Sequence, residues 1–327
     1  MKKWIGRLLS GSEKEEQAPE DTEEMLDDED EQDVELRSLN KEVDATYYRW
    51  LTAAAGYDAS TELQTRILDG VRMLVHDPGS AAELVPRVPE LIPKLLRGLM
   101  DENFSTTELS RELSADPVLV AEVIRESNSA YYKPLTPIKT LEAAVMMLGL
   151  NGVRMLLARV ALRPLVKMQV EGFARHALPI VWSQSEKCAF AASMLAPGMS
   201  ASVFESYLAG LMQNVGLIVA FRMADRHCEG GRMPGSSEFG LRLLNISRQL
   251  SAVIAAHWNF PQEVADAIAH AGKPDTPLAE ALAHGDRVSK LRLLIDANVI
   301  PEDDPFVTEG LDNFQRRCLG KLGDLDA

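Results

Sequence analysis

Residues Leu208–Gly216 read LAGLMQNVG, an apolar stretch that carries two neutral amides, Gln213 and Asn214. The stretch lies within residues 202–224, where apolar residues recur at the spacing of a helix. Aromatic residues make up only 6% of the chain, whereas Ala, Leu and Met are plentiful, and this composition favours helices. Further helices are expected over residues 141–148, 151–162, 177–196, 239–258, 261–271 and 277–297. Because their links are short and no segment alternates with period two, the sequence predicts a compact all-α, multi-helix bundle.

Several helix ends are marked by the residues that favour them. Asp116 followed by Pro117 predicts an N-cap and a first helical residue, opening a helix that continues through Ile124. Thr140 is expected to cap the helix at 141–148, and Gly149 to end it. The sequence therefore predicts separate helices on the two sides of Gly149.

The N-terminal 44 residues differ from the rest of the chain in charge. Residues 1–44 carry 16 acidic and 6 basic side chains, so they hold most of the net charge of −15. Few apolar residues offset the entropy of ordering them, which predicts a disordered acidic tail. Its first nine residues combine basic and apolar side chains, a pattern that fits a short amphipathic start in weak contact with a membrane surface, or simply a disordered end.

The remainder divides into three parts. Residues 45–84 are expected to form accessory helices, residues 85–297 the main helical domain, and residues 298–327 a C-terminal tail or short helix. This remainder is only mildly acidic, and it lacks the basic field that holds a nucleic-acid backbone. No apolar stretch approaches the roughly 20 residues needed to cross a bilayer. Strong nucleic-acid binding and membrane insertion are therefore not expected.

The chain has three cysteines, Cys188, Cys228 and Cys318. They form no CxxC pair, and their odd number and wide spacing do not fit a disulfide framework. Such usage is typical of a reducing compartment, which predicts a cytoplasmic protein.

Six strings of sequence occur in an order and at spacings that resemble one known family. They are Leu91–Leu96, Glu108–Tyr132, Ile138–Gly149, Trp182–Ala189, Leu208–Gly216 and Trp258–His270. Together they resemble the HDOD family, a bacterial signal-output domain related to HD-type metal phosphohydrolases. The resemblance covers about residues 85–275 and implies two helical lobes, over residues 91–165 and 177–272.

The resemblance also implies which chemistry is lost. In catalytic relatives the segment at 208–216 carries a metal-binding His-Asp pair, whereas this chain has Gln213 and Asn214. Two other family histidines would fall at Gln184 and Ser247, and His270 matches a further family position. Neutral amides are weak donors for a di-metal site, so no metal and no cofactor are expected. These five residues are predicted to line a vestigial pocket, which either holds a small polar ligand such as a nucleotide or is closed by amide hydrogen bonds.

A second candidate site follows the helix at 117–124. Asn128, Ser129, Tyr131 and Tyr132 form a polar and aromatic group that fits an interaction patch. The alternative is structural: a helix C-terminus in which the asparagine satisfies backbone groups and the tyrosines pack beneath it.

The resemblance therefore favours a non-catalytic regulatory module of bacterial signal transduction, which binds a protein partner or a nucleotide-like ligand. One alternative is a divergent metal-dependent HD-type phosphohydrolase or phosphodiesterase. Another is a DNA-binding regulator, because residues 106–113 and 117–126 loosely resemble a helix-turn-helix. The second helix of that pair carries Glu122, Arg125 and Glu126, which make a poor recognition surface.

Overall fold

The computed structural model describes residues 38–52, 56–85, 117–128, 134–162, 165, 171–228 and 232–323. The chain divides into two compact units, residues 1–39 and residues 40–327. The expected acidic tail up to residue 37, the cap at Asp116 and the helix at 106–113 lie outside the described residues.

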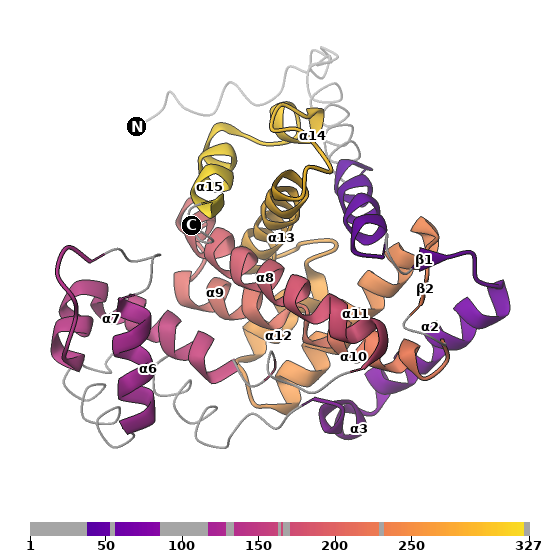
Figure 1. Cartoon of the computed structure of the whole chain (residues 1–327), viewed down its shortest axis with the longest axis horizontal. Coiled ribbons are helices and arrows are strands. Elements are labelled where there is room, and N and C mark those ends of the chain that lie inside the picture. The colour runs from indigo at the N-terminus through magenta and orange to yellow at the C-terminus, as the bar shows by residue number, and fades with distance from the viewer. Residues whose placement is uncertain are drawn as a thin grey trace, which may run out of the picture. The chain divides into compact units, whose positions relative to one another are not determined.

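The described residues are almost entirely helical, which confirms the predicted all-α class (Figure 1). Residues 38–52 form a helix, so helical structure begins inside the segment expected to be a tail. The elements that follow are β1 (Gly56–Tyr57), α2 (Thr61–His76), α3 (Pro78–Glu83), α6 (Pro117–Ser127), α7 (Leu141–Leu162), α8 (Gly172–Leu195), the 3₁₀ helix η2 (Ala196–Met199), α9 (Val203–Met212), α10 (Val215–Asp225), β2 (Met233–Pro234), α11 (Ser237–His257), α12 (Gln262–His270), α13 (Pro277–Asp296), α14 (Pro305–Thr308) and α15 (Asn313–Gly323). The two short strands pair in parallel, with Gly56 opposite Met233.

Helix α8 is central to the packing. It lies against α9 and α13, and α10 packs against both α8 and α11 (Figure 1). Helix α11 in turn contacts α2 and α12. Helices α6 and α7 pack on each other, and α7 also packs against α9. The second predicted lobe, residues 177–272, corresponds to α8–α12, whereas α6 and α7 belong to the first, of which residues 91–116 lie outside the described residues.

Small residues allow the central helices to approach closely. A Cβ atom on Gly210 of α9 would lie 2.5 Å from the Cα atom of Ala189 on α8. A Cβ atom on Gly285 of α13 would lie 2.7 Å from the backbone nitrogen of Ala192, one turn further along α8. Only glycine fits at such separations, so α8, α9 and α13 form a tight three-helix unit.

Local sequence patterns predict some of the helix ends correctly and miss others. Thr140 accepts a hydrogen bond from the backbone N–H of Ala143 (3.2 Å), and Gly149 has a φ of 67° that breaks α7, as predicted. Helix α8 begins five residues before the predicted start at 177. Its first N–H groups, those of Phe173 and Ala174, donate to the Asp225 carboxylate at 2.9 and 3.0 Å. This cap comes from a distant part of the chain and leaves no local signal.

Two stretches among the described residues are long and apolar enough to cross a membrane, 141–162 and 203–225. The expectation that no stretch approaches this length was therefore too strict. The apolar window of the second stretch is 89% buried, and the stretch is interrupted between α9 and α10, so these residues form part of the protein core. The first is broken at Gly149 and is 44% buried. Length and composition alone make this weak evidence for a membrane span.

Candidate functional site

The turn between α9 and α10 positions the two amides that the sequence singled out. The prediction of one continuous helix over 202–224 is wrong at this point, because α9 ends at Met212 and α10 begins at Val215. Ser251 of α11 fixes the turn: its hydroxyl donates to the carbonyl of Gln213 (2.5 Å) and accepts from the N–H of Gly216 (2.8 Å). Gln213 and Asn214 thereby lie in the turn, and both side chains are buried.

The amides form a connected hydrogen-bond network with α8. The Nδ2 group of Asn214 donates to the Oε1 atom of Gln184 and to the Ser185 hydroxyl (3.0 Å). The Nε2 group of Gln184 donates to Asp286 Oδ1 (2.8 Å) and to the Ser289 hydroxyl (2.9 Å). Gln213 also donates to Asp286 Oδ1, at 3.1 Å. Gln184 and Gln213 are therefore joined through one buried carboxylate, and Asn214 is joined to them through Gln184, as expected for polar groups without access to water.

That carboxylate belongs to a cluster of four charged side chains. Asp286 Oδ2 accepts from Lys290 Nζ at 2.6 Å and from Arg248 Nη2 at 2.7 Å. The same two cations reach Asp44 of the helix at 38–52, with Lys290 at 2.5 Å and Arg248 at 3.4 Å. We call Asp44, Arg248, Asp286 and Lys290 the charge cluster. Its two positive and two negative charges balance, which is the arrangement that makes burial of charge tolerable.

The cluster shifts the ionisation of its own members. Burial alone would raise the pKa of Asp286, but Lys290 and Arg248 outweigh it and lower that pKa to about 2. Burial would likewise lower the pKa of Arg248, and the two aspartates raise it instead. The pKa of the neighbouring Tyr47 hydroxyl is raised by burial first and then by Asp286 and Asp44. At neutral pH Asp286 and Arg248 are therefore charged, and Tyr47 is protonated.

A stability change in acid follows from the lowered pKa of Asp286. The group contributes stability above its unfolded pKa of about 3.9, and loses it as the pH falls toward about 2, where the folded protein also takes up the proton. The expected loss is about 2 kcal/mol between pH 4 and pH 2. Urea unfolding of the wild type and of an Asp286→Asn variant at several pH values measures it. The variant should lack this part of the pH dependence, and parallel curves for the two proteins would contradict the prediction.

The family of the chain follows from its similarity to known proteins. The HDOD domain family matches residues 85–274, more than half of the sequence. The chain belongs to the HDOD family. The resemblance in the six strings is thereby confirmed. The charge cluster combines Arg248 from the matched HDOD region with three members from outside it: Asp44, Asp286 and Lys290.

Individual relatives are distant. A candidate metal-dependent phosphohydrolase from Shewanella amazonensis SB2B is 18% identical, with a TM-score of 0.55 over 80% of this chain and 98% of that one. A candidate signal transduction protein from Marinobacter aquaeolei VT8 is 22% identical, with a TM-score of 0.53 over 78% of this chain and 66% of that one. An uncharacterized protein of Treponema pallidum (strain Nichols) is 24% identical over 212 residues, which are 61% of this chain but only 40% of that relative. At these identities the structural likeness shows the HDOD-type fold alone.

The donors at this position do not fit the metal centre of a phosphohydrolase. Gln184, Gln213 and Asn214 offer neutral oxygens, and the nearby Asp286 carboxylate is held by two cations within 2.7 Å. A divalent ion prefers several anionic or imidazole ligands and would be repelled by Arg248 and Lys290. Across the described part of the chain, no group of three or more His, Cys, Asp or Glu side chains is arranged to hold a metal ion.

The two other residues of the predicted pocket behave differently. Ser247 is buried on α11, and among the described residues its hydroxyl has no hydrogen-bond partner. His270 ends α12 with its side chain 51% exposed, and its Nδ1 atom lies 3.4 Å from Asp275. The structure thus joins Gln184 to Asn214 directly and to Gln213 through Asp286, whereas the described contacts of His270 lie at the surface.

The second predicted site is only partly described. Asn128 closes a loop, since its Nδ2 group donates to the carbonyls of Ile124 (2.7 Å) and Ile138 (2.8 Å), and its Oδ1 atom accepts from the N–H of Ile138 (2.7 Å). These are the backbone bonds of the structural alternative. Ser129, Tyr131 and Tyr132 lie outside the described residues.

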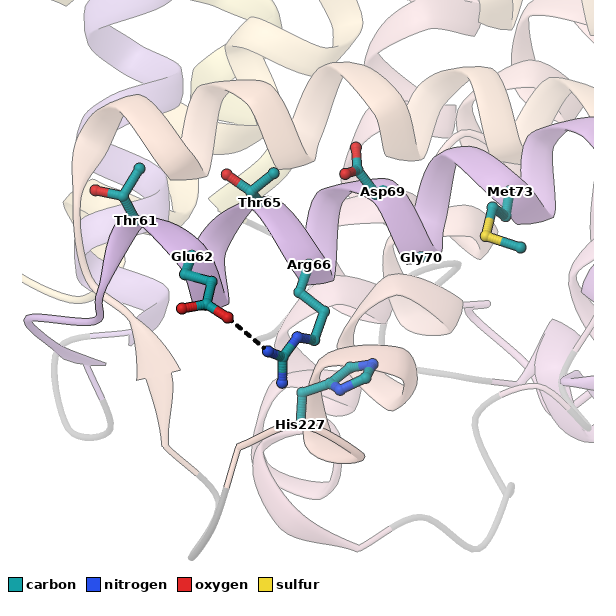
Figure 2. Close-up of a pocket in the computed structure, with 8 residues that line it drawn as sticks. All are labelled: Thr61, Glu62, Thr65, Arg66, Asp69, Gly70, Met73 and His227. Atoms are coloured by element: carbon teal, nitrogen blue, oxygen red, sulfur yellow. Dashed lines mark hydrogen bonds and ion pairs between the residues drawn. The ribbon is translucent and has the colours of Figure 1, made fainter.

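An open groove runs along α2 (Figure 2). It is lined by Thr61, Glu62, Thr65, Arg66, Asp69, Gly70, Met73 and His227. Its volume of about 640 Å³ would admit a small molecule. However, Glu62 pairs with Arg66 (3.0 Å) and Asp69 with Arg72 (2.6 Å) on the same helix. The charges of α2 thus neutralise one another, and we assign the groove no function.

Proposed function

We propose that this HDOD protein is a non-catalytic module of bacterial signal transduction, which acts in the cytoplasm by binding a protein partner or a small ligand. The observation that carries the proposal is the Asp286 carboxylate, held by Lys290 and Arg248 at 2.6 and 2.7 Å beside the amides Gln184 and Gln213. The two amides occupy sequence positions at which the family resemblance would expect metal ligands.

Hydrolysis by a phosphohydrolase requires hydroxide to be formed at neutral pH. A metal-dependent hydrolase lowers the pKa of a bound water, and this requires a cation that its ligands hold firmly. Arg248 and Lys290 oppose such a cation by Coulomb repulsion, and the carboxylates of Asp286 and Asp44 only balance these two positive charges. Neutral amides compensate neither this repulsion nor the loss of the ion's hydration. Binding without hydrolysis is therefore the function that this arrangement supports best.

The alternative is a divergent phosphohydrolase, and the name of the Shewanella relative favours it. The two functions differ in their response to metal. Purified wild-type protein dialysed against zinc, manganese or iron(II) should retain less than one ion per chain by elemental analysis. It should release no more phosphate from a panel of nucleotides and cyclic dinucleotides than buffer does. A known metal phosphohydrolase assayed in parallel shows that the conditions support hydrolysis, and chelator-sensitive turnover by this chain would refute the proposal.

The partner of such a module is expected to be a protein, with the acidic residues that precede the helix at 38–52 as a tether. The acidic charge of that segment and of the chain as a whole disfavours strong binding to nucleic acid, and membrane contact would be weak and confined to the N-terminus. The DNA-binding alternative relies on residues 106–113, which lie outside the described residues, and Arg125 of the other helix pairs with Glu122.

A further inference from the structure

The solvent exposure of the side chains in the charge cluster differs from one member to the next. The Lys290 and Asp286 side chains are 3% and 7% exposed, whereas those of Arg248 and Asp44 are 15% and 17% exposed. Asp44 is therefore the member of the cluster that solvent reaches most easily. It is also held by fewer donors than Asp286, which is bound by Gln184, Gln213, Arg248 and Lys290.

We propose that the charge cluster is a binding site for a phosphate group, and that the Asp44 carboxylate occupies this site until a phosphate-bearing ligand displaces it. This inference rests on the proposed function, because it names the class of ligand that the module binds. The site consists of Lys290 Nζ and the Arg248 guanidinium, the two groups that now donate to Asp44.

The balance of charge supports the exchange. Without the Asp44 carboxylate, Arg248, Lys290 and Asp286 carry a net charge of +1 in a largely buried place, an unfavourable state that an anion would relieve. Arginine and lysine together are suited to phosphate, because the planar guanidinium donates two parallel hydrogen bonds and the ammonium adds a compact charge.

A further donor lies beside the site. Tyr47 follows Asp44 by three residues on the same helix, and its ring lies against Lys290, with Nζ 5.6 Å from the ring centroid. Its hydroxyl is buried and has no hydrogen-bond partner among the described residues. A carboxylate offers two oxygens, whereas a phosphate group offers at least three. The tyrosine hydroxyl can serve an oxygen that Asp44 does not provide.

The exchange does not require the helix to leave. Tyr48 packs over Gly240, where a Cβ atom would lie 2.2 Å from the tyrosine ring, and its hydroxyl donates to the carbonyl of Pro234 at 2.7 Å. Val43, Tyr47 and Leu51 of the same helix are buried as well. The helix is therefore anchored, and a change of the Asp44 side-chain rotamer is the smallest movement that frees the two cations.

The test compares phosphate binding by full-length wild type, Asp44→Ala and an Asp69→Ala control, whose aspartate is exposed and pairs only with Arg72 among the described contacts. Calorimetry at low ionic strength should show inorganic phosphate binding to Asp44→Ala at least ~10-fold more tightly than to wild type or to the control. Millimolar phosphate should also raise the melting temperature of Asp44→Ala selectively. Equal phosphate affinity of Asp44→Ala and wild type would overturn the proposal.

Additional variants and ligands identify the binding site and the source of the phosphate group. An Asp44→Ala/Lys290→Met double variant should lose the gained affinity, and retention of that affinity would place the phosphate elsewhere and overturn the proposal. Acetate should bind Asp44→Ala more weakly than phosphate, and equal binding would overturn the choice of phosphate. Tighter binding of a nucleoside monophosphate than of inorganic phosphate would support a nucleotide ligand, and equal binding would support free phosphate.

A second variant and the metal-dependent assay distinguish failure of this inference from failure of the proposed function. If Asp44→Ala fails to fold, the nearly isosteric Asp44→Asn variant removes the same charge and is held to the same expectations. If phosphate does not bind the variant more tightly, the phosphate site is refuted, and the non-catalytic role would involve another ligand. Metal-dependent hydrolysis by the wild type, in contrast, would remove the proposed function and this inference with it.

Discussion

The Asp286→Ala variant is expected to lose about 3–5 kcal/mol of unfolding free energy, because the substitution leaves buried cations without their main counterion. Asp286 accepts hydrogen bonds from Lys290, Arg248, Gln184 and Gln213, so its removal also leaves two buried amides short of an acceptor. Denaturant unfolding followed by circular dichroism measures the effect. The matched control, Asp303→Ala, removes an exposed aspartate and should change stability by less than about 0.5 kcal/mol.

A double-mutant cycle separates the ion pair from the loss of the side chain. Asp286→Ala/Lys290→Met removes one charge of each sign, so it should be less destabilised than the sum of the two single variants by at least about 1 kcal/mol. Additive effects would mean that Asp286 and Lys290 do not interact as the 2.6 Å separation implies. An Asp286→Ala protein as stable as the wild type would contradict the description of the cluster as a buried, charge-balanced unit.

The sequence predicted the helical class from local patterns, and the family resemblance singled out the amides. Apolar periodicity and cap residues such as Thr140 and Gly149 are properties of short segments, and the structure agrees with them. The turn at Gln213 and Asn214 was missed because residues 208–220 are apolar apart from these two amides. The signal for it is the Ser251 hydroxyl, which lies on another helix.

The charged members of the site were missed for a related reason. Asp286 and Lys290 are four residues apart on α13, a spacing typical of an exposed ion pair. Their burial arises because α8 and the helix at 38–52 cover that face, which no local pattern records. Asp44 was assigned to the acidic tail, since its charge resembles that of the residues before it. Its role depends on Tyr47 and Tyr48, the first buried aromatic residues of the described chain.

Gly210→Ala is the second substitution with a large expected effect, because it tests the close packing that holds the site together. The new methyl group would lie 2.5 Å from the Cα atom and 2.6 Å from the backbone nitrogen of Ala189, so α8 and α9 would have to separate. Backbone atoms cannot rotate away as a side chain can, and overpacking of this kind destabilises by about 1–3 kcal/mol or more. Separation would also move Gln184 of α8 from the α9–α10 turn, where Asn214 contacts it.

Gly320→Ala provides the matched control, because Gly320 lies within α15 and a Cβ atom there would meet no atom within 4 Å. In a helix, alanine is favoured over glycine by about 0.5–1 kcal/mol, so this variant should be more stable than the wild type. The same chemical change is thus expected to have opposite signs at the two positions. Thermal and urea unfolding of both variants measure it, and a stabilised Gly210→Ala protein would show that α8 and α9 do not meet at the separation described. The difference arises because helix propensity acts alike at both positions, whereas only Gly210 faces the backbone of another helix.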